Sequence, residues 1–218
     1  MNERYSRQAD IVPRHRIENC VGTIIGVGAI GRQVALQLTA IGIPHIQLID
    51  FDTVEISNLA SQGYLQDDLN RPKVDATGDL CRQLDHNLNI ETINERFKRT
   101  TPTSNIIFCC VDKIDTRKHI FEAVKDHANF FCDARMSAET LRIITAHDEA
   151  SRIYYPNTIF NANKAYAGPC TAKSTIYTAN IAAGFMLTQF TKHLRNLPID
   201  KDIQLNLLAS EIYIDMTK

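Results

Sequence analysis

The chain has 218 residues, of which 44% are hydrophobic and 22% charged, and its formal net charge at pH 7 is −1. This even charge balance gives no electrostatic basis for binding nucleic acid or an anionic membrane, and we expect neither as a partner. No apolar run approaches the roughly 20 residues that span a bilayer, and the polar N-terminus is unlike a secretory signal. We therefore expect a cytoplasmic protein.

Six cysteines are present, and no two of them form a C-x-x-C pair: Cys20, Cys81, Cys109, Cys110, Cys132 and Cys170. Structural zinc sites usually contain such pairs, so we expect no zinc. Several of the cysteines lie in apolar, strand-like runs. This pattern is typical of reduced thiols in a cytosolic protein rather than of a disulfide framework.

Residues 1–20 form a polar N-terminal arm that contains four arginines: Arg4, Arg7, Arg14 and Arg16. Charged runs are usually solvated, so charge alone favours an exposed arm. The alternative is that one of these arginines reaches a phosphate, for instance in a partner subunit.

Residues 21–52 are predicted to form a strand, a glycine turn, a helix and a second strand. The β-branched run at 23–27 suits a buried parallel strand. A G-x-G-x-x-G pattern overlaps its end, with Gly26, Gly28 and Gly31 as the glycines and Ala29 and Ile30 between the last two. Apolar residues then recur at helical spacing, and the next strand ends at Asp50.

This pattern is typical of a nucleotide site. Gly26 permits the tight turn, Gly28 lets the backbone approach a phosphate, and Gly31 allows the helix to pack closely on the strand. The helix N-terminus offers free N–H groups to an anion, and Asp50, 19 residues after Gly31, is placed to accept ribose hydroxyls. The alternative is that the glycines serve packing alone.

The next segments supply further polar candidates at the ends of predicted strands. Asp50 and Asp52 follow the second strand, where open α/β sheets bind ligands, and Asn58 lies in the following loop. A helix is predicted over 73–84. A cation at its start is disfavoured by the helix dipole, so we expect Lys73 to act on an anionic ligand.

A strand is predicted at 89–93, and a fully apolar strand at 106–111 is followed at once by Asp112. An acidic residue at this position is a candidate for Mg²⁺ or ribose binding. The alternative, compatible with the first, is that Asp112 caps a helix over 113–127.

The C-terminal third is predicted to contain short strands at 129–132 and 141–146, a functional or mobile loop over 148–169, a long helix over 171–194, and one or two antiparallel strands over 203–216. The fold class is therefore α/β. We expect a Rossmann-like, doubly wound, mostly parallel sheet with helices on both faces and antiparallel strands toward the C-terminus.

We expect a single domain over 1–218. Its parts are the arm (1–20), a nucleotide-binding core (21–147), and a segment of loop, helix and strands (148–218).

Several motifs, in order and spacing, resemble the E1-like activating enzymes, the group that includes ThiF, MoeB, HesA and the adenylation domains of ubiquitin-activating enzymes. They are R-Y-S-R-Q at 4–8, G-V-G-A-I-G at 26–31, L-I-D-F-D-T-V at 48–54, S-N-L at 57–59, D-x₄-K at 68–73 and C-V-D-x-x-D-x-R at 110–117. Together they cover about residues 4–120.

The resemblance implies ATP rather than NAD, and adenylation of the C-terminal glycine of a small β-grasp protein with release of pyrophosphate. By position it implies that Asp50 holds the ribose, that Asp52 lies near the nucleotide or its metal, and that Asn58 and Lys73 contact the phosphates. It also implies that Asp112 coordinates Mg²⁺.

The resemblance further implies a dimer, here taken as a homodimer, in which Arg7 reaches the ATP of the other subunit. This implication reverses the expectation, drawn from charge alone, that the arginines of the arm are merely solvated. Arg7, Lys73, Asp112 and the thiol of Cys170 are thus the candidate catalytic groups.

Cys170 is the candidate for a thiol that receives the activated protein as a thioester. It precedes the predicted long helix, and a thiol at a helix N-terminus has a lowered pKa. The alternative is that Cys170 is a buried cap residue. An E2-like protein would be a further partner in a conjugation pathway.

The chain departs from the family pattern in three ways. Ser61 stands where S-N-L-x-R-Q has arginine, Asn70 stands where D-x-G-x-x-K has glycine, and the paired zinc cysteines are absent. The missing arginine leaves Arg7 and Lys73 to balance the triphosphate, or requires another cation such as Arg71.

Two alternative functions stay open at this stage. One is an NAD-dependent oxidoreductase, with which Asp50 is compatible. The other is a degenerate nucleotide-binding subunit of a heterodimeric activating enzyme, which Ser61 favours.

Overall fold

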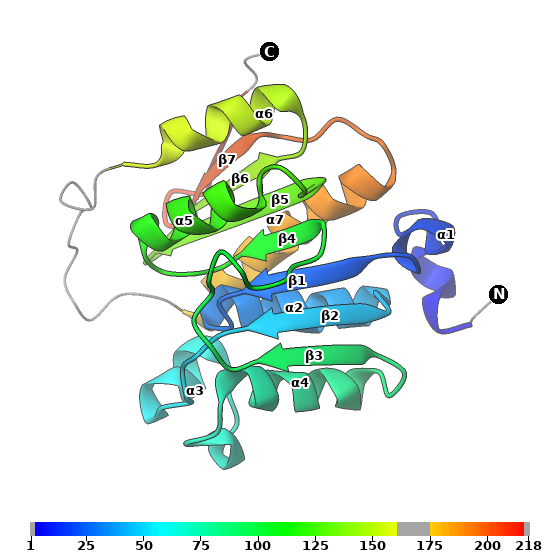
Figure 1. The fold of residues 1–218 in the computed structure, drawn as a ribbon, viewed down its shortest axis with the longest axis vertical. Helices are drawn as coiled ribbons and strands as arrows, with labels where there is room; N and C mark the ends of the chain where they lie inside the picture. The colour runs from blue at the N-terminus through cyan, green and yellow to red at the C-terminus, as the bar shows by residue number, and fades with distance from the viewer. Residues whose placement is uncertain (1–2, 161–174, 216–218) are drawn as a thin grey trace.

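The computed structural model describes residues 3–160 and 175–215. Within these ranges eight strands form one sheet in the order β3-β2-β1-β4-β5-β6-β7-β8 (Figure 1). The strands are β1 Val21–Ile25, β2 His45–Ile49, β3 Asn89–Ile93, β4 Ile106–Cys109, β5 Phe130–Ser137, β6 Thr140–Ala146, β7 Asp202–Asn206 and β8 Glu211–Ile214.

The first five strands across the sheet pair in parallel, and the last three pairings are antiparallel. The chain passes from β1 to β2 and β3 on one side and then crosses to β4 on the other. The carboxyl ends of β1 and β4 therefore flank the point where the winding reverses, which is where open α/β sheets bind ligands.

Helices cover both faces of the sheet (Figure 1). The α-helices are α1 Arg14–Ile17, α2 Ala29–Ile41, α3 Ile56–Gln62, α4 Lys73–Leu84, α5 Ile114–Val124, α6 Glu149–Tyr154 and α7 Ile176–Leu194. Three short 3₁₀ helices, η1 Glu3–Gln8, η2 Gln66–Asp68 and η3 Tyr155–Thr158, complete the elements. The predicted fold class is confirmed.

Two apolar cores lie on the two faces because successive residues of a strand point to opposite sides. Ile24 of β1 packs into the core with α2, α4 and α7, whereas Ile25 packs into the core with α5 and Tyr155. The small residues Ala182 and Ala183 of α7 are fully buried in the first core. None of the helices in the described ranges is long and apolar enough to cross a membrane.

Several predicted boundaries are corrected. Residues 148–158 are not loop: Asp148 caps α6 by accepting a hydrogen bond from the Ser151 amide at 2.8 Å, and η3 follows. The D-x-x-S pattern is a helix start signal that periodicity alone missed. The strand predicted at 106–111 ends at Cys109, and the strand predicted at 129–132 extends to Ser137 because it pairs with β6.

The predicted cap at Asp112 is wrong. Helix α5 begins at Ile114 with Lys113 as its N-cap, so Asp112 lies one residue outside the cap. The described part of the long C-terminal helix begins at Ile176, and residues 171–174 of the predicted helix lie outside the described residues.

The stability of the fold depends on Gly31 in a way that can be tested. A Cβ on Gly31 would lie 1.8 Å from the Gly26 carbonyl oxygen, which is backbone and cannot move aside easily. We expect Gly31→Ala to lower the free energy of unfolding by about 3 kcal/mol or more, as overpacking does at its upper end.

The matched control is Gly184→Ala in α7, where the new Cβ would meet only the Gln37 side chain at 4.0 Å. It should raise the free energy of unfolding by about 0.5–1 kcal/mol because alanine is the better helix former. Urea unfolding measures both variants, and equal effects would contradict the close-packing argument.

Candidate functional site

The glycine turn between β1 and α2 forms the centre of the site. Gly26 has φ +88°, which favours glycine, and a Cβ there would lie 2.8–2.9 Å from the backbone of Cys110 and Val111. The turn therefore lies directly against the chain that follows β4. At Gly28 the added Cβ would meet, among the described residues, only Gln62 Oε1 at 3.8 Å, so these residues leave space beside Gly28 for a ligand.

The N-terminus of α2 faces this open space without a side-chain cap. Its N-cap is Gly28, and among residues 3–160 and 175–215 no side chain accepts a hydrogen bond from the first-turn amides. The N–H groups of Ala29, Ile30 and Gly31 have no intrahelical acceptor because they lie in the first turn. A thirteen-residue helix that begins in this way is suited to bind a phosphate.

Two side chains orient the peptide groups of the turn. Asp50 Oδ2 accepts from the Val27 amide at 2.6 Å, and the Tyr64 hydroxyl donates to the Val27 carbonyl at 2.6 Å. Since the C=O and N–H of a trans peptide point in opposite directions, the Gly28 N–H points away from Tyr64. Tyr64 has no motif signature, and the sequence analysis missed it.

Asp50 thus has a structural role in addition to the predicted ribose contact. Its Oδ1 accepts from the Asp52 amide at 2.9 Å, so both carboxylate oxygens bind backbone. Burial raises the pKa of Asp50, while the two backbone hydrogen bonds and Lys73 act in the opposite sense.

Lys73 and Asp52 form an ion pair beside the turn. Lys73 is the first residue of α4 and is buried, and its Nζ lies 3.1 Å from Asp52 Oδ2, whereas the Asp52 side chain is half exposed. Asp52 already balances the charge of Lys73. The position of Lys73 at a helix start therefore gives less support to a role on an anionic ligand than the sequence suggested.

Asn58 and Ser61 lie on α3, and both side chains bind within the protein. Asn58 Oδ1 accepts from the Glu55 amide at 2.9 Å and closes the capping box at the start of the helix. Ser61 Oγ donates to the Ser57 carbonyl at 2.9 Å.

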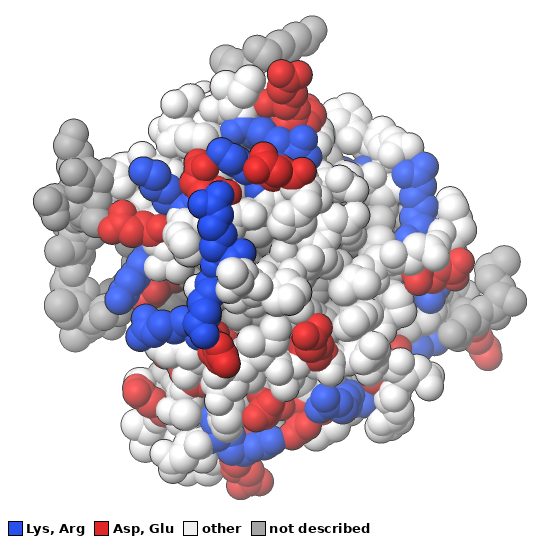
Figure 2. All heavy atoms as spheres, in the orientation of Figure 1, with Lys and Arg blue, Asp and Glu red and all other residues white. Residues whose placement is uncertain are grey.

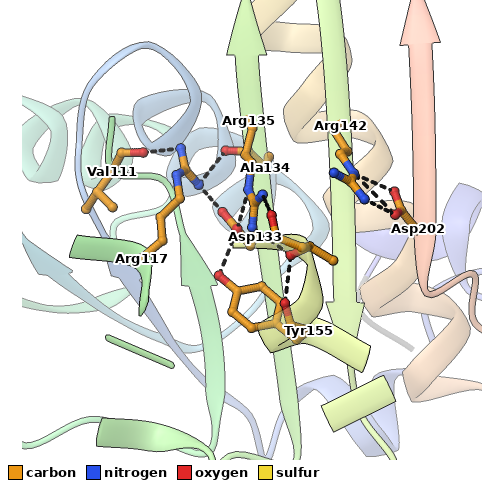
Figure 3. Close-up of polar contacts among 9 residues, drawn as sticks. Val111, Arg117, Asp133, Ala134, Arg135, Arg142, Tyr155 and Asp202 are labelled. Carbon is orange, nitrogen blue, oxygen red and sulfur yellow. Dashed lines mark hydrogen bonds and ion pairs between the residues drawn. The ribbon is translucent and has the colours of Figure 1, made fainter. Parts of the chain in front are cut away.

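Asp112 is exposed and follows the Cys110–Val111 backbone that contacts Gly26. Its loop is anchored by Arg117, which donates to the carbonyl of Val111 and to the buried carboxylate of Asp133 (Figure 3). The position of Asp112 beside the turn is therefore fixed from the neighbouring strand β5.

Asp133 is fully buried and forms ion pairs with two arginines (Figure 3). Arg135 Nε lies 2.9 Å from Asp133 Oδ2, and the Tyr155 hydroxyl donates to the same oxygen at 2.9 Å. Arg135 also donates to the carbonyl and hydroxyl of Thr158, at 2.7 and 3.0 Å. One carboxylate thus joins β5, α5 and η3.

Arg7 lies far from the turn of its own chain. Its element η1 contacts the C-terminal end of α2, where Gln8 donates to the Ile41 carbonyl at 2.9 Å, whereas the turn precedes the N-terminal end. Thirteen residues of helix separate the two ends by roughly 20 Å. The Arg7 side chain is exposed.

Two of the residues singled out in the sequence remain, Arg71 and Cys170. Arg71 is bound to Asp79 and lies 3.3 Å from Asp68, so it is already neutralised. Cys170 lies outside the described residues.

The described cysteines are free thiols, as the sequence predicted. Burial raises the pKa of Cys81 to about 11 and that of Cys132 to about 12, which makes both unreactive.

Acidic and basic side chains are interspersed on the surface shown in Figure 2. In the described ranges no three His, Cys, Asp or Glu side chains gather to bind a metal. Mg²⁺ at nucleotide sites usually has one or two protein carboxylates as ligands, and substrate phosphates and water supply the rest. The carboxylate of Asp112 fits such a metal.

The Asp133 network should be essential for stability. Asp133→Asn leaves Arg117 and Arg135 buried without a counter-charge, so we expect a loss of about 3–5 kcal/mol in the free energy of unfolding. The control is Asp79→Asn, which removes an exposed partner of Arg71 and Arg82 and should cost less than about 1 kcal/mol. Urea unfolding measures both, and a small effect at Asp133 would show that the network is dispensable.

Comparison with known proteins places the chain in a family. The model of the ThiF family matches residues 5–211. Molybdopterin-synthase adenylyltransferase of Haemophilus influenzae is 32% identical over 128 residues, covering 54% of this chain and 53% of the relative. Ubiquitin-like modifier-activating enzyme 5 of Drosophila willistoni is 27% identical over 207 residues, covering 83% of this chain and 51% of the relative. The chain spans about half the length of the curated relatives it matches.

Solved structures share the fold. The structure of selenomethionine PaaA matches with a TM-score of 0.79 and 23% identity, covering 98% of this chain and 72% of that one. Escherichia coli MccB with MccA matches with a TM-score of 0.77 and 19% identity, covering 99% of this chain and 71% of that one. With the family match over nearly its whole length, the chain belongs to the ThiF family.

Proposed function

We propose that this protein uses ATP to adenylate the C-terminal glycine carboxylate of a ubiquitin-like or sulfur-carrier protein. The observation that carries the proposal is the uncapped N-terminus of α2 at the glycine turn, flanked by Asp112 and the Lys73–Asp52 pair. The names of relatives support it: the H. influenzae relative is an adenylyltransferase, and one in E. coli is the sulfur carrier protein ThiS adenylyltransferase.

The chemistry requires charge stabilisation rather than a nucleophilic side chain. A carboxylate oxygen of the protein substrate attacks the α-phosphorus of ATP, the new P–O bond forms, and the bond to the β-phosphate breaks to release pyrophosphate. Negative charge accumulates on the phosphoryl oxygens during this step. Lys73 and the amides at the start of α2 would stabilise that charge, and Asp50 would accept the ribose hydroxyls.

Mg²⁺ would be held by Asp112 together with the phosphates, and it would neutralise part of their charge. The exposed carboxylate lies beside the turn, and its loop is fixed by Arg117. These features provide the oxygen ligand that such a metal needs.

ATP is favoured over NAD by the residues outside the glycine turn. The ion pair of Lys73 and the carboxylate of Asp112 flank the turn, and a hydride transfer would have no use for them. MccB has been crystallised with ATP and with AMPCPP, which supports nucleotide binding in this fold.

The partner would be a small β-grasp protein that ends in glycine. Strand β8 lies at an edge of the sheet and carries apolar side chains that are largely exposed, among them Ile212 at 61% and Tyr213 at 62%. An unpaired strand edge with apolar side chains is suited to binding another protein.

Later steps of the pathway rest on the sequence alone. Transfer of the activated protein to Cys170 as a thioester, and from there to an E2-like protein, would follow adenylation. A cytoplasmic location and a single adenylation domain over 1–218 also remain part of the proposal.

The test is partner-dependent exchange of radiolabelled pyrophosphate into ATP. We expect Lys73→Met to lower the exchange rate by about a hundredfold, because it removes a cation that stabilises the transition state. Lys98→Met, which removes an exposed cation paired with Glu95, should leave the rate unchanged. A thermal melt of each variant checks that it is folded.

Wild-type protein that binds ATP but catalyses no exchange with any glycine-ending partner would contradict this function. That outcome would instead favour a degenerate subunit of a heterodimer, an alternative supported by Ser61, which stands where the family pattern has arginine.

Arg7 is proposed to act on the ATP of the other subunit of a homodimer. The distance of η1 from its own turn supports this role in trans. We expect Arg7→Ala and Lys73→Met each to be inactive alone. Mixed and allowed to exchange subunits, they should recover about a quarter of wild-type activity, because half of the dimers then contain one intact site. The same mixture would stay inactive if Arg7 acted within its own chain.

A further inference from the structure

The guanidinium of Arg32 is buried and contacts Tyr64, whose hydroxyl binds the glycine turn. Arg32 follows Gly31 in the first turns of α2, and its side chain is 0% exposed. A fully buried charge is costly unless it is paired or serves a function. The groups that contact the guanidinium therefore indicate whether the charge of Arg32 is paired or serves a function.

Arg32 joins three elements around the turn. Its Nε donates to the Gly63 carbonyl at 3.2 Å, and its Nη1 donates to Thr77 Oγ1 at 3.1 Å. The guanidinium also lies over the ring of Tyr64, 4.1 Å from the centroid. Since Tyr64 donates to the Val27 carbonyl, the cation contacts the residue that orients the turn.

The charge of Arg32 is incompletely neutralised. Its Nη2 is buried and has no hydrogen-bond partner in the part of the chain that the structure describes. The closest carboxylate oxygen, Asp68 Oδ2, lies 3.9 Å away and accepts from the Leu65 amide at 2.9 Å. The other oxygen of Asp68 binds Arg71. Burial lowers the pKa of Arg32.

Other polar side chains near the turn have close hydrogen-bond or ion-pair partners. Ser61 is neutral and engaged with Ser57, Arg71 is held by Asp79 and Asp68, and Lys73 is paired with Asp52. Arg32 differs from Arg71 and Lys73, because its carboxylate neighbour Asp68 lies 3.9 Å away, beyond hydrogen-bond distance.

We propose that Arg32 is a positioning residue whose buried charge strengthens the binding of nucleotide phosphates at the turn. The inference rests on the ATP site proposed above. A charge in a poorly solvated region acts over several ångströms because the effective dielectric constant is lower there than in water. Phosphate binding in turn compensates the buried cation.

The test compares ligands that share adenosine and differ in charge. Dissociation constants for ATP, AMP and adenosine are measured by calorimetry on wild type, Arg32→Met and Arg32→Gln. We expect the neutral variants to raise the dissociation constant of ATP on the order of tenfold. The dissociation constant of AMP should rise less, and that of adenosine should not change. Arg32→Lys, which keeps the charge, should retain most of the ATP affinity.

Arg82→Met is the matched control, because Arg82 is a half-exposed arginine of α4 that pairs with Asp79. It should leave all three affinities unchanged. Arg32→Gln retains a donor for Gly63 and serves if Arg32→Met does not fold.

Equal weakening of ATP and adenosine would overturn the inference, since it would show that Arg32 acts only by supporting the fold. Unchanged ATP affinity in a folded neutral variant would overturn it as well, while leaving the proposed function intact. Absence of ATP binding by wild type would refute the proposed function, and this inference with it.

Discussion

The contact between the Gly26 carbonyl and Gly31 is the constraint on which the site depends. Asp50 binds the Val27 amide, and the same peptide directs the Gly26 carbonyl toward α2, where only a hydrogen atom fits. The contact brings the helix N-terminus against the end of β1 and leaves its first amides uncapped. Because Gly26 also lies against Cys110 and Val111, the same turn fixes the distance to the loop of Asp112.

Buried polar groups hold this arrangement from two sides. On one side, Arg32 of α2 binds Gly63 and Thr77, and Tyr64, which follows α3, binds Val27 of the turn. On the other, Asp133 ties β5 to Arg117 and so to the Asp112 loop. Such networks are stable only when nearly every group has a partner, and in the described part of the chain Arg32 Nη2 is one of three buried side-chain atoms without a hydrogen-bond partner, together with Gln62 Oε1 and His45 Nε2.

The site residues differ in how far the sequence could predict them. The glycine turn, Asp50 and Asp112 each follow a strand whose carboxyl end faces the same edge of the sheet, and Lys73 at the start of α4 lies 3.1 Å from Asp52. Asn58 caps α3, and Asp52 pairs with Lys73, so both have structural roles that spacing did not show. Tyr64 and Arg32 were not predicted because neither is part of a recognisable motif or of a periodic apolar pattern.

By itself the sequence determined the β1–turn–α2–β2 unit, the parallel core and the position of the antiparallel C-terminal strands. Their determinants are local: glycine spacing, apolar periodicity and helix caps. Only the tertiary structure decided which charges meet. Arg32 binds Thr77 across 45 residues, and Arg117 binds Asp133 across 16. Side-chain hydrogen bonds between distant segments depend on how the helices pack on the sheet, and no short stretch of sequence encodes that packing.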